Sequence, residues 1–149
     1  MRIGLVCSAG GHFYELYCLE SLWKKYEKFW VTFKKEDTEF LLAEERVYWA
    51  YAPTTRHFKN FWRNLILAMK ILRREKPQVI ITTGAGVGVP FLLVGRFLGM
   101  KTVFIESMAR VRRLSLSGRL VYWLADRFLV QWPDLAQRHR RALFRGQVI

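Results

Sequence analysis

The chain has 149 residues, which suits a single domain over 1–149 with its own hydrophobic core. Its two cysteines, Cys7 and Cys18, are too few for the disulfide framework of a small secreted protein, and we expect both to be reduced. No apolar run reaches the roughly 18 residues that a membrane-spanning helix needs. The formal net charge of +13 favours anionic partners, namely nucleic acid, an anionic lipid surface or an acidic protein.

Apolar runs of strand length alternate with helical patterns along the whole chain. We predict strands at residues 3–7, 29–33, 79–83, 102–105 and 127–131, and a strand or extended segment at 47–52. We predict helices at residues 13–25, 37–45, 58–74, 89–98, 116–124 and 133–143. This alternation is typical of a Rossmann-like α/β domain, a parallel sheet with helices on both faces, whose usual strand order is 3-2-1-4-5-6.

Two glycine-rich loops follow the first and the fourth predicted strands. Their residues of interest are Ser8, Gly10, Gly11, His12, Gly84, Gly86 and Gly88. In the expected strand order these two strands are neighbours where the order reverses, so the loops face each other. Glycine lets a ligand approach the backbone closely, and a helix N-terminus attracts anions. We therefore predict that the two loops bind a phosphate or diphosphate group. The alternatives are turn glycines beside a solvated histidine in the first loop, and a turn with close helix–strand packing in the second.

Three side chains near these loops indicate chemistry. His12 stands at the rim of the predicted site and exchanges a proton near neutral pH, so it is our candidate base. Glu106 follows the fifth strand at the same edge of the sheet and is a second catalytic candidate. Alternatively, Glu106 caps the next segment or pairs with Arg110. We assign Arg110 to the diphosphate, the alternative being a solvated basic loop, and we interpret His57 and His139 as surface residues.

The predicted helix at 58–74 combines apolar residues at helical spacing with basic residues on its other faces. Its first turns contain Phe58, Phe61, Trp62 and Arg63. Aromatic side chains beside Lys and Arg are typical of a helix that enters the interface of an anionic membrane. We predict membrane contact through these four residues; the alternative is an ordinary helix whose apolar stripe faces the core.

Five separated motifs resemble one known family when taken together. They are SAGGH (8–12), TTGAGVGVP (82–90), IESMARV (105–111), LSLSG (114–118) and LVQWP (129–133). They look like the PssD-type polysaccharide-biosynthesis proteins. These are bacterial relatives of the membrane-recruiting subunit of the eukaryotic dolichol-linked GlcNAc transferase. The resemblance covers essentially the whole chain.

The resemblance implies the N-terminal, acceptor-binding half of a GT-B glycosyltransferase divided between two polypeptides. A PssE-type partner would bring the nucleotide-sugar-binding half, and the pair would be active only as a complex. The acceptor would be a sugar on a lipid diphosphate, used for exopolysaccharide or capsule. Because the sequence begins directly with its first strand, we expect peripheral binding at the cytoplasmic face of the plasma membrane, without a transmembrane segment.

The same loops resemble those of the related MurG transferases. There a Gly-Gly-His loop and a second glycine loop face the lipid-diphosphate acceptor, which implies the same role for both loops of this chain. Glu106 resembles the glutamate of the His-Glu-Gln-Asn motif near the acceptor sugar, although Ile105, Ser107 and Met108 replace its neighbours.

An inverting sugar transfer needs a base that takes the proton of the acceptor hydroxyl. His12 is the candidate, oriented by Glu106 or Glu15, and we expect neither a metal ion nor a cofactor. The alternative function is a non-catalytic membrane scaffold that recruits and activates the catalytic partner. A nucleic-acid-binding domain is a third interpretation, which the facing glycine loops disfavour.

Overall fold

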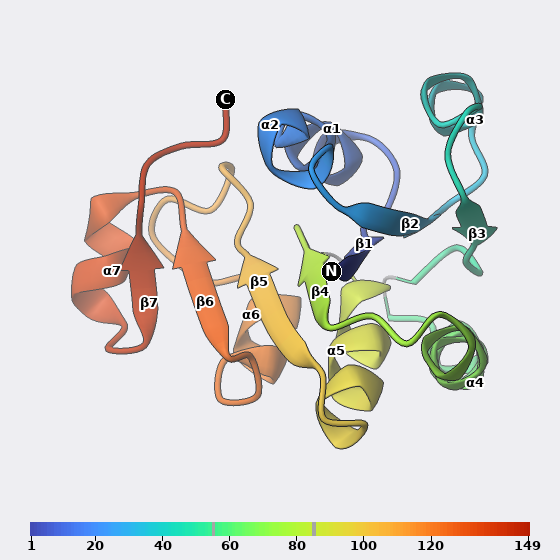
Figure 1. Cartoon of the computed structure of the whole chain (residues 1–149). Coiled ribbons are helices and arrows are strands. Elements are labelled where there is room, and N and C mark those ends of the chain that lie inside the picture. Colours follow the sequence, from blue (N-terminus) through green and yellow to red (C-terminus); the bar gives the residue numbers. More distant parts are fainter. Residues whose placement is uncertain (55, 85) are drawn as a thin grey trace.

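The computed structural model describes residues 1–54, 56–84 and 86–149; Ala85, in the second glycine loop, lies outside them. Seven strands in this part of the chain form one parallel sheet in the order β3-β2-β1-β4-β5-β6-β7 (Figure 1). The strands are β1 (Arg2–Val6), β2 (Glu27–Thr32), β3 (Val47–Trp49), β4 (Val79–Thr82), β5 (Lys101–Ile105), β6 (Arg127–Val130) and β7 (Ala142–Phe144). The helices are α1 (Gly11–Tyr17), α2 (Glu20–Trp23), α3 (Glu36–Leu41), α4 (Phe58–Glu75), α5 (Gly88–Phe97), α6 (Leu116–Val121) and α7 (Pro133–Arg138).

The predicted fold class and the order of the first six strands are confirmed. β4 lies in the middle of the sheet, paired with β1 on one side and β5 on the other. Its sequence Val-Ile-Ile-Thr is mostly buried, as suits a central parallel strand that helices cover on both faces. The carboxyl ends of β1 and β4 are therefore adjacent.

The predicted helix at 133–143 is wrong beyond Arg138. The chain turns there, and the three residues Ala142–Phe144 add a seventh strand that pairs in parallel with β6. Arg141 explains the turn: its backbone N–H donates to the Tyr122 hydroxyl (2.7 Å) and its guanidinium to the carbonyl of Ala125 (2.8 Å). These contacts, far away in the sequence, hold the segment beside the sheet.

The predicted helix at 13–25 is divided into α1 and α2. The indole N–H of Trp23 donates to the carbonyls of Leu16 (3.2 Å) and Tyr17 (3.3 Å) at the end of α1. The second bond gives a partner to the Tyr17 carbonyl at the helix end, whereas the Leu16 carbonyl also accepts from the backbone N–H of Leu19 (3.1 Å). α1 therefore stops after two turns, and Leu16 and Trp23 are buried together against the sheet.

Helices cover both faces of the sheet: α1, α2 and α3 lie on one side and α4, α5 and α6 on the other (Figure 1). One core, which includes Leu16 and Trp30, lies under the first group, and another, which includes Leu72 and Phe91, under the second. α5 packs between α4 and α6, which is why it is apolar nearly all round. Among the described residues, no helix combines the length and the apolar content that crossing a bilayer requires.

α4 positions the segment that leads into the candidate site. Its first turn is capped by His57, whose Nδ1 accepts a hydrogen bond from the backbone N–H of Asn60 (3.1 Å). The buried Asn60 side chain donates to the carbonyl of Pro53 (2.8 Å). One turn further, buried Asn64 bonds both backbone groups of Tyr51 (2.9 and 3.0 Å). The two asparagines thus hold residues 51–53 against the helix.

Candidate functional site

The loops after β1 and β4 meet, as the strand order predicts. His12, the second residue of α1, places its imidazole Nδ1 2.9 Å from the carbonyl oxygen of Thr83. The Thr83 hydroxyl donates in return to the carbonyl of His12 at 2.5 Å. A Cβ on Gly84, whose φ is +105°, would lie 3.7 Å from the His12 ring. Two segments 71 residues apart are thereby joined around one histidine.

The hydrogen bond to Thr83 decides which nitrogen of His12 carries the proton. A backbone carbonyl only accepts, so Nδ1 donates and the neutral ring has its bare nitrogen at Nε2. Nε2 is then the atom that can take a proton. The group that orients the ring is thus a backbone carbonyl, not the carboxylate of Glu106 or Glu15 that we expected.

A cavity of about 680 Å³ opens beside His12. Its lining contains both polar and apolar side chains. The polar part includes Thr54, His57, Ser107, Arg110, Ser115 and Ser117. The apolar part includes Phe58, Phe61, Val89, Leu116 and Leu120. The volume is in the range of small-molecule sites, and the lining suits a ligand with an anionic head and an apolar tail.

The glycines of the second loop have different surroundings. Gly86 lines the cavity and touches Thr54 so closely that an added Cβ would be 2.9 Å from the threonine Cβ. Gly88 is buried at the start of α5, where a Cβ would lie 2.5 Å from Oγ1 of Thr82. Gly88 thus serves helix–strand packing, while Gly86 forms part of the cavity wall.

The first loop is open at its glycines. Gly10 and Gly11 are exposed, and a Cβ on either would meet nothing within 4 Å. Gly10 has a φ of +80°, which favours glycine. Ser8 is buried and its hydroxyl donates to the carbonyl of Ala9 (3.4 Å), away from the cavity lining. Diphosphate binding by these residues stays a prediction.

Glu106 lies beneath the cavity and is only 1% exposed. Its Oε1 accepts from the backbone N–H of Ser107 (3.1 Å), and its Oε2 accepts from the N–H (2.9 Å) and hydroxyl (3.0 Å) of Ser115. Ser115 in turn caps α6 by accepting from the N–H of Gly118 (2.9 Å). These contacts favour the alternative in which Glu106 caps the following segment, and its role in catalysis stays a prediction.

Glu15, one turn after His12, ties α1 to the same loop. The backbone N–H of Met108 donates to its Oε1 at 2.7 Å, and the Gln131 amide lies 3.4 Å from the same oxygen. Oε2 is buried and has no hydrogen-bond partner within the described part of the chain. The loop that carries Ser107 and Arg110 into the cavity is therefore held by two buried carboxylates.

The residues predicted to contact a membrane lie around the start of α4. Phe58 and Trp62 are exposed, and Arg63 is exposed with its guanidinium 5.5 Å from the centre of the Tyr51 ring. Phe61 is half-buried, lines the cavity and packs edge-to-face on Trp62 (6.0 Å between ring centres). The exposed positions fit the membrane prediction, and Phe61 belongs to the cavity wall instead.

Several cavity residues were missed from the sequence. We took His57 for a surface histidine, but it is half-buried, caps α4 and lines the cavity. Ser115 carried a usable signal, because serine before a helical pattern is a common cap. Leu116 and Leu120 share one helical face by their spacing, but only the packing of α6 shows that this face borders the cavity.

Comparison with known proteins identifies the family. A family model for "Oligosaccharide biosynthesis protein Alg14 like" matches residues 51–148, more than half of the chain. The chain belongs to this family. The match includes the second glycine loop, Glu106 and the cavity residues of α4 and α6, whereas the His12 loop precedes it. The UDP-N-acetylglucosamine transferase subunit alg14 of Schizosaccharomyces pombe is 49% identical over 102 residues, which are 63% of this chain and 48% of that relative. The chain thus spans about half the length of this relative.

Solved structures show how widely the fold is used. MurG of Acinetobacter baumannii aligns with a TM-score of 0.72 at 15% identity, over 90% of this chain and 42% of the MurG chain. UDP-N-acetylglucosamine 2-epimerase of Rickettsia bellii aligns with a TM-score of 0.77 at 11% identity, over 99% of this chain and 45% of the epimerase. Because structures named for different reactions share it, the fold alone does not select one, and the function must be argued from the family and the site.

Proposed function

We propose that this Alg14-like chain is the acceptor-binding subunit of a two-component inverting glycosyltransferase of the PssD type. A PssE-type partner brings the nucleotide-sugar-binding half. The complex transfers a sugar from a UDP-sugar to a monosaccharide on polyprenyl diphosphate, for exopolysaccharide or capsule, at the cytoplasmic face of the plasma membrane. The observation that carries the proposal is His12, held through Nδ1 with Nε2 bare, beside a cavity lined by both polar and apolar side chains.

The chemistry asked of this chain is proton transfer. The acceptor hydroxyl attacks the anomeric carbon of the donor sugar and forms the new C–O bond, while the bond from that carbon to the UDP oxygen breaks. As the hydroxyl oxygen attacks, Nε2 of His12 takes its proton and makes the oxygen a stronger nucleophile. UDP leaves, and the configuration at the anomeric carbon is inverted. The Thr83 carbonyl keeps Nδ1 protonated, so the ring accepts the new proton at Nε2.

The mixed polar and apolar lining of the cavity fits the acceptor. We assign its sugar to the end at His12, its diphosphate to Arg110 and the backbone around Gly86, and its isoprenoid tail to the apolar wall formed by Phe58 and Leu116. The loop that carries Ser107 and Arg110 into the cavity is held in place by the two buried glutamates, Glu15 and Glu106.

The test is turnover by the reconstituted complex. The chain is co-purified with a PssE-type polypeptide and given a short-chain polyprenyl-diphosphate sugar and a panel of UDP-sugars. We expect activity only with both subunits.

His12→Gln should lower kcat by about 10²–10⁴-fold, the usual contribution of a general base. His139→Gln is the matched control, because His139 packs on Tyr122 outside the cavity lining, and it should keep kcat within about twofold of wild type. Full turnover by an intact His12→Gln complex contradicts the base assignment.

The scaffold alternative is favoured by one observation, the exposed apolar residues at the start of α4. It places all chemistry in the partner and leaves this chain to bring it to the membrane. Three reactions separate the two functions: the partner alone, the partner with wild-type chain, and the partner with His12→Gln. A scaffold restores equal activity with either form of the chain, whereas an acceptor-binding catalytic subunit restores it only with wild type.

A further inference from the structure

The short helix α6 presents an apolar row to solvent. Leu116 and Leu120, one turn apart on α6, are 63% and 57% exposed, and Trp123, in the turn directly after the helix, is 74% exposed. Leu116 and Leu120 also form one wall of the cavity. A row of large exposed apolar side chains beside a cavity marks an interaction surface.

A second row of the same kind runs along α4. Phe58, Trp62 and Ile66 follow one another at four-residue spacing and are all exposed. Phe58 lines the same cavity as Leu116 of α6. The two rows therefore frame the cavity from opposite sides, with the buried helix α5 between them.

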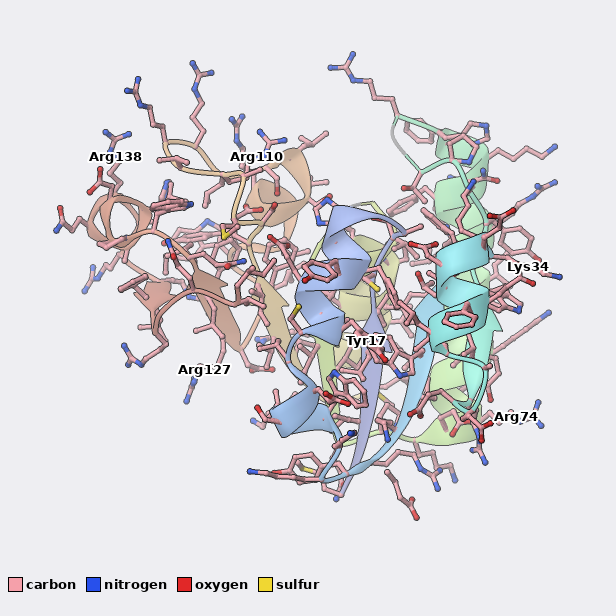
Figure 2. The ribbon with its side chains drawn as sticks, turned by 90° about the horizontal axis from the view of Figure 1, so that it is seen from above. Tyr17, Lys34, Arg74, Arg110, Arg127 and Arg138 are labelled. Atoms are coloured by element: carbon pink, nitrogen blue, oxygen red, sulfur yellow. The ribbon has the colours of Figure 1, made fainter. Side chains whose placement is uncertain are left out.

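Both rows lie in segments of the chain whose charged residues are all basic. Residues 46–74 contain seven Lys and Arg and no acidic residue, and residues 107–125 contain four Arg and no acidic residue. Eight of the 12 acidic residues lie instead within residues 1–45, which end before α4 begins. Figure 2 shows Arg110 and Arg138 together at one end of the molecule and Arg74 and Arg127 at the other. Apolar rows inside a field of positive charge are complementary to anionic lipid.

Trp123 is held in place in the turn after α6. The guanidinium of Arg141 lies 5.7 Å from the centre of its ring, and the same guanidinium donates to the carbonyl of Ala125 (2.8 Å). Because this hydrogen bond holds Arg141 in place, Arg141 in turn keeps the Trp123 indole in its exposed position. Tryptophan in this position is typical of a side chain at the water–lipid boundary.

We propose that α6 is a second membrane-insertion element that acts together with the start of α4, so that the cavity opens into an anionic leaflet between the two helices. The acceptor then enters sideways from the bilayer, tail first between Phe58 and Leu116. This inference rests on the proposed function for its lipid-linked acceptor, and it adds the surface and the route by which that acceptor arrives.

Vesicle binding tests the surface directly. The full chain is sedimented with vesicles of neutral phosphatidylcholine, alone or with roughly 30% phosphatidylglycerol. We expect binding to depend on the anionic lipid, and the double variant Leu120→Ser, Trp123→Ser to lose about tenfold or more in affinity. Phe97→Ser is the matched control: Phe97 is 78% exposed, but it lies at the far end of α5 from Gly88 and should change affinity by less than about twofold. Thermal unfolding by circular dichroism checks that each variant is folded.

Tryptophan fluorescence gives a second measurement at the same site. Brominated lipids quench an indole that enters the bilayer, so Trp123→Phe and Trp62→Phe should each remove part of the quenching. Unchanged quenching in Trp123→Phe, or vesicle binding by the double variant equal to wild type, overturns the proposal. Loss of partner-subunit binding with vesicle binding intact assigns the row to a protein interface and also overturns it. An equal loss in Phe97→Ser shows unspecific adsorption and does the same.

The wild-type complex in detergent keeps the two proposals separate. Detergent removes the need for membrane docking, so turnover there tests only the proposed transferase function. If turnover is absent in detergent while vesicle binding still depends on α6, the function is wrong and the membrane surface stands. If turnover is present and the α6 variants bind vesicles normally, the function stands and this inference is wrong.

Discussion

Glu75 and Glu15 are both buried, but they lie at opposite ends of the sheet and have opposite surroundings. Glu75 ends α4 near the amino ends of the strands. Both of its oxygens lie 3.0 Å from the guanidinium of Arg46, and the Tyr48 hydroxyl donates to one of them at 2.6 Å. Arg2 lies 3.6 Å away. Burial by itself raises the pKa of Glu75, but these hydrogen bonds and charges bring it below the ordinary value of 4.5.

Glu15 lies near the carboxyl ends of the strands and has neutral partners. Its one satisfied oxygen accepts from the Met108 N–H, and its other oxygen is buried without a partner in the described residues. The comparison shows that the two ends of the sheet use buried carboxylates differently. At the amino end, charge pairing stabilises the fold. At the carboxyl end, a carboxylate holds the cavity loop at some cost in stability.

The largest expected effect on stability comes from breaking the Glu75 cluster. Glu75→Gln removes the charge that Arg46 and Arg2 face, so the free energy of unfolding should fall by about 2–4 kcal/mol. Urea denaturation measures it. The control is Glu27→Gln, which removes the exposed partner of Arg2 and should cost less than about 0.5 kcal/mol. Equal losses in both variants would contradict a special role for the buried carboxylate.

The next effect concerns the carboxylate that supports Ser115. A methyl group in Gly118→Ala would collide with Oε2 of Glu106, which is buried and cannot move aside. We expect a loss of about 1–3 kcal/mol, measured by urea denaturation. Gly11→Ala is the matched control at the same end of the sheet, where the added methyl meets nothing within 4 Å, and it should change stability by less than about 0.5 kcal/mol. Unchanged stability in Gly118→Ala would show that the Glu106 side chain can move and does not hold Ser115 rigidly.

The pH dependence of stability should come from the paired carboxylates. For Asp126, burial raises the pKa, but hydrogen bonds from Thr102 and the charges of Lys101 and Arg96 bring it below 3.8. A carboxyl group with a lowered pKa in the folded state stabilises the fold above its ordinary pKa, and this stabilisation is lost as pH falls through the folded value. The melting temperature should therefore change little from neutral pH to about pH 5 and then fall steeply below pH 4.5. Glu75→Gln should flatten that fall, and an unchanged profile would contradict the assignment.

The smallest effect is expected at Glu15. Glu15→Gln keeps an acceptor for the Met108 N–H and removes a buried charge that lacks a cationic partner among the described residues. The free energy of unfolding should change by less than about 1 kcal/mol, in contrast to Glu75→Gln. The same urea titration measures both variants. A loss of 2 kcal/mol or more would mean that the charge of Glu15 is itself stabilising and would remove the contrast between the two ends.

The site shows which inferences a linear pattern supports. That His12 and Gly84 meet follows from strand order, because two loops after neighbouring parallel strands share one edge. That the partner of His12 is the Thr83 carbonyl does not follow, since every residue has a carbonyl and the pattern favoured a carboxylate. Glu106 was placed at the correct edge, but its burial against Ser115 depends on how α6 packs.

The sequence by itself determined the alternation of strands and helices, the parallel sheet and the meeting of the two glycine loops, because periodicity and glycine placement act locally. Tertiary structure alone decided β7, the break between α1 and α2, and the apolar row of α6 beside the cavity. Each of these depends on how distant parts of the chain pack, as in the contacts of Arg141 with Ala125 and of Trp23 with Leu16, or in the shared cavity lined by Leu116 and Phe58. This packing forms only after the chain has folded, so no local sequence pattern predicts it.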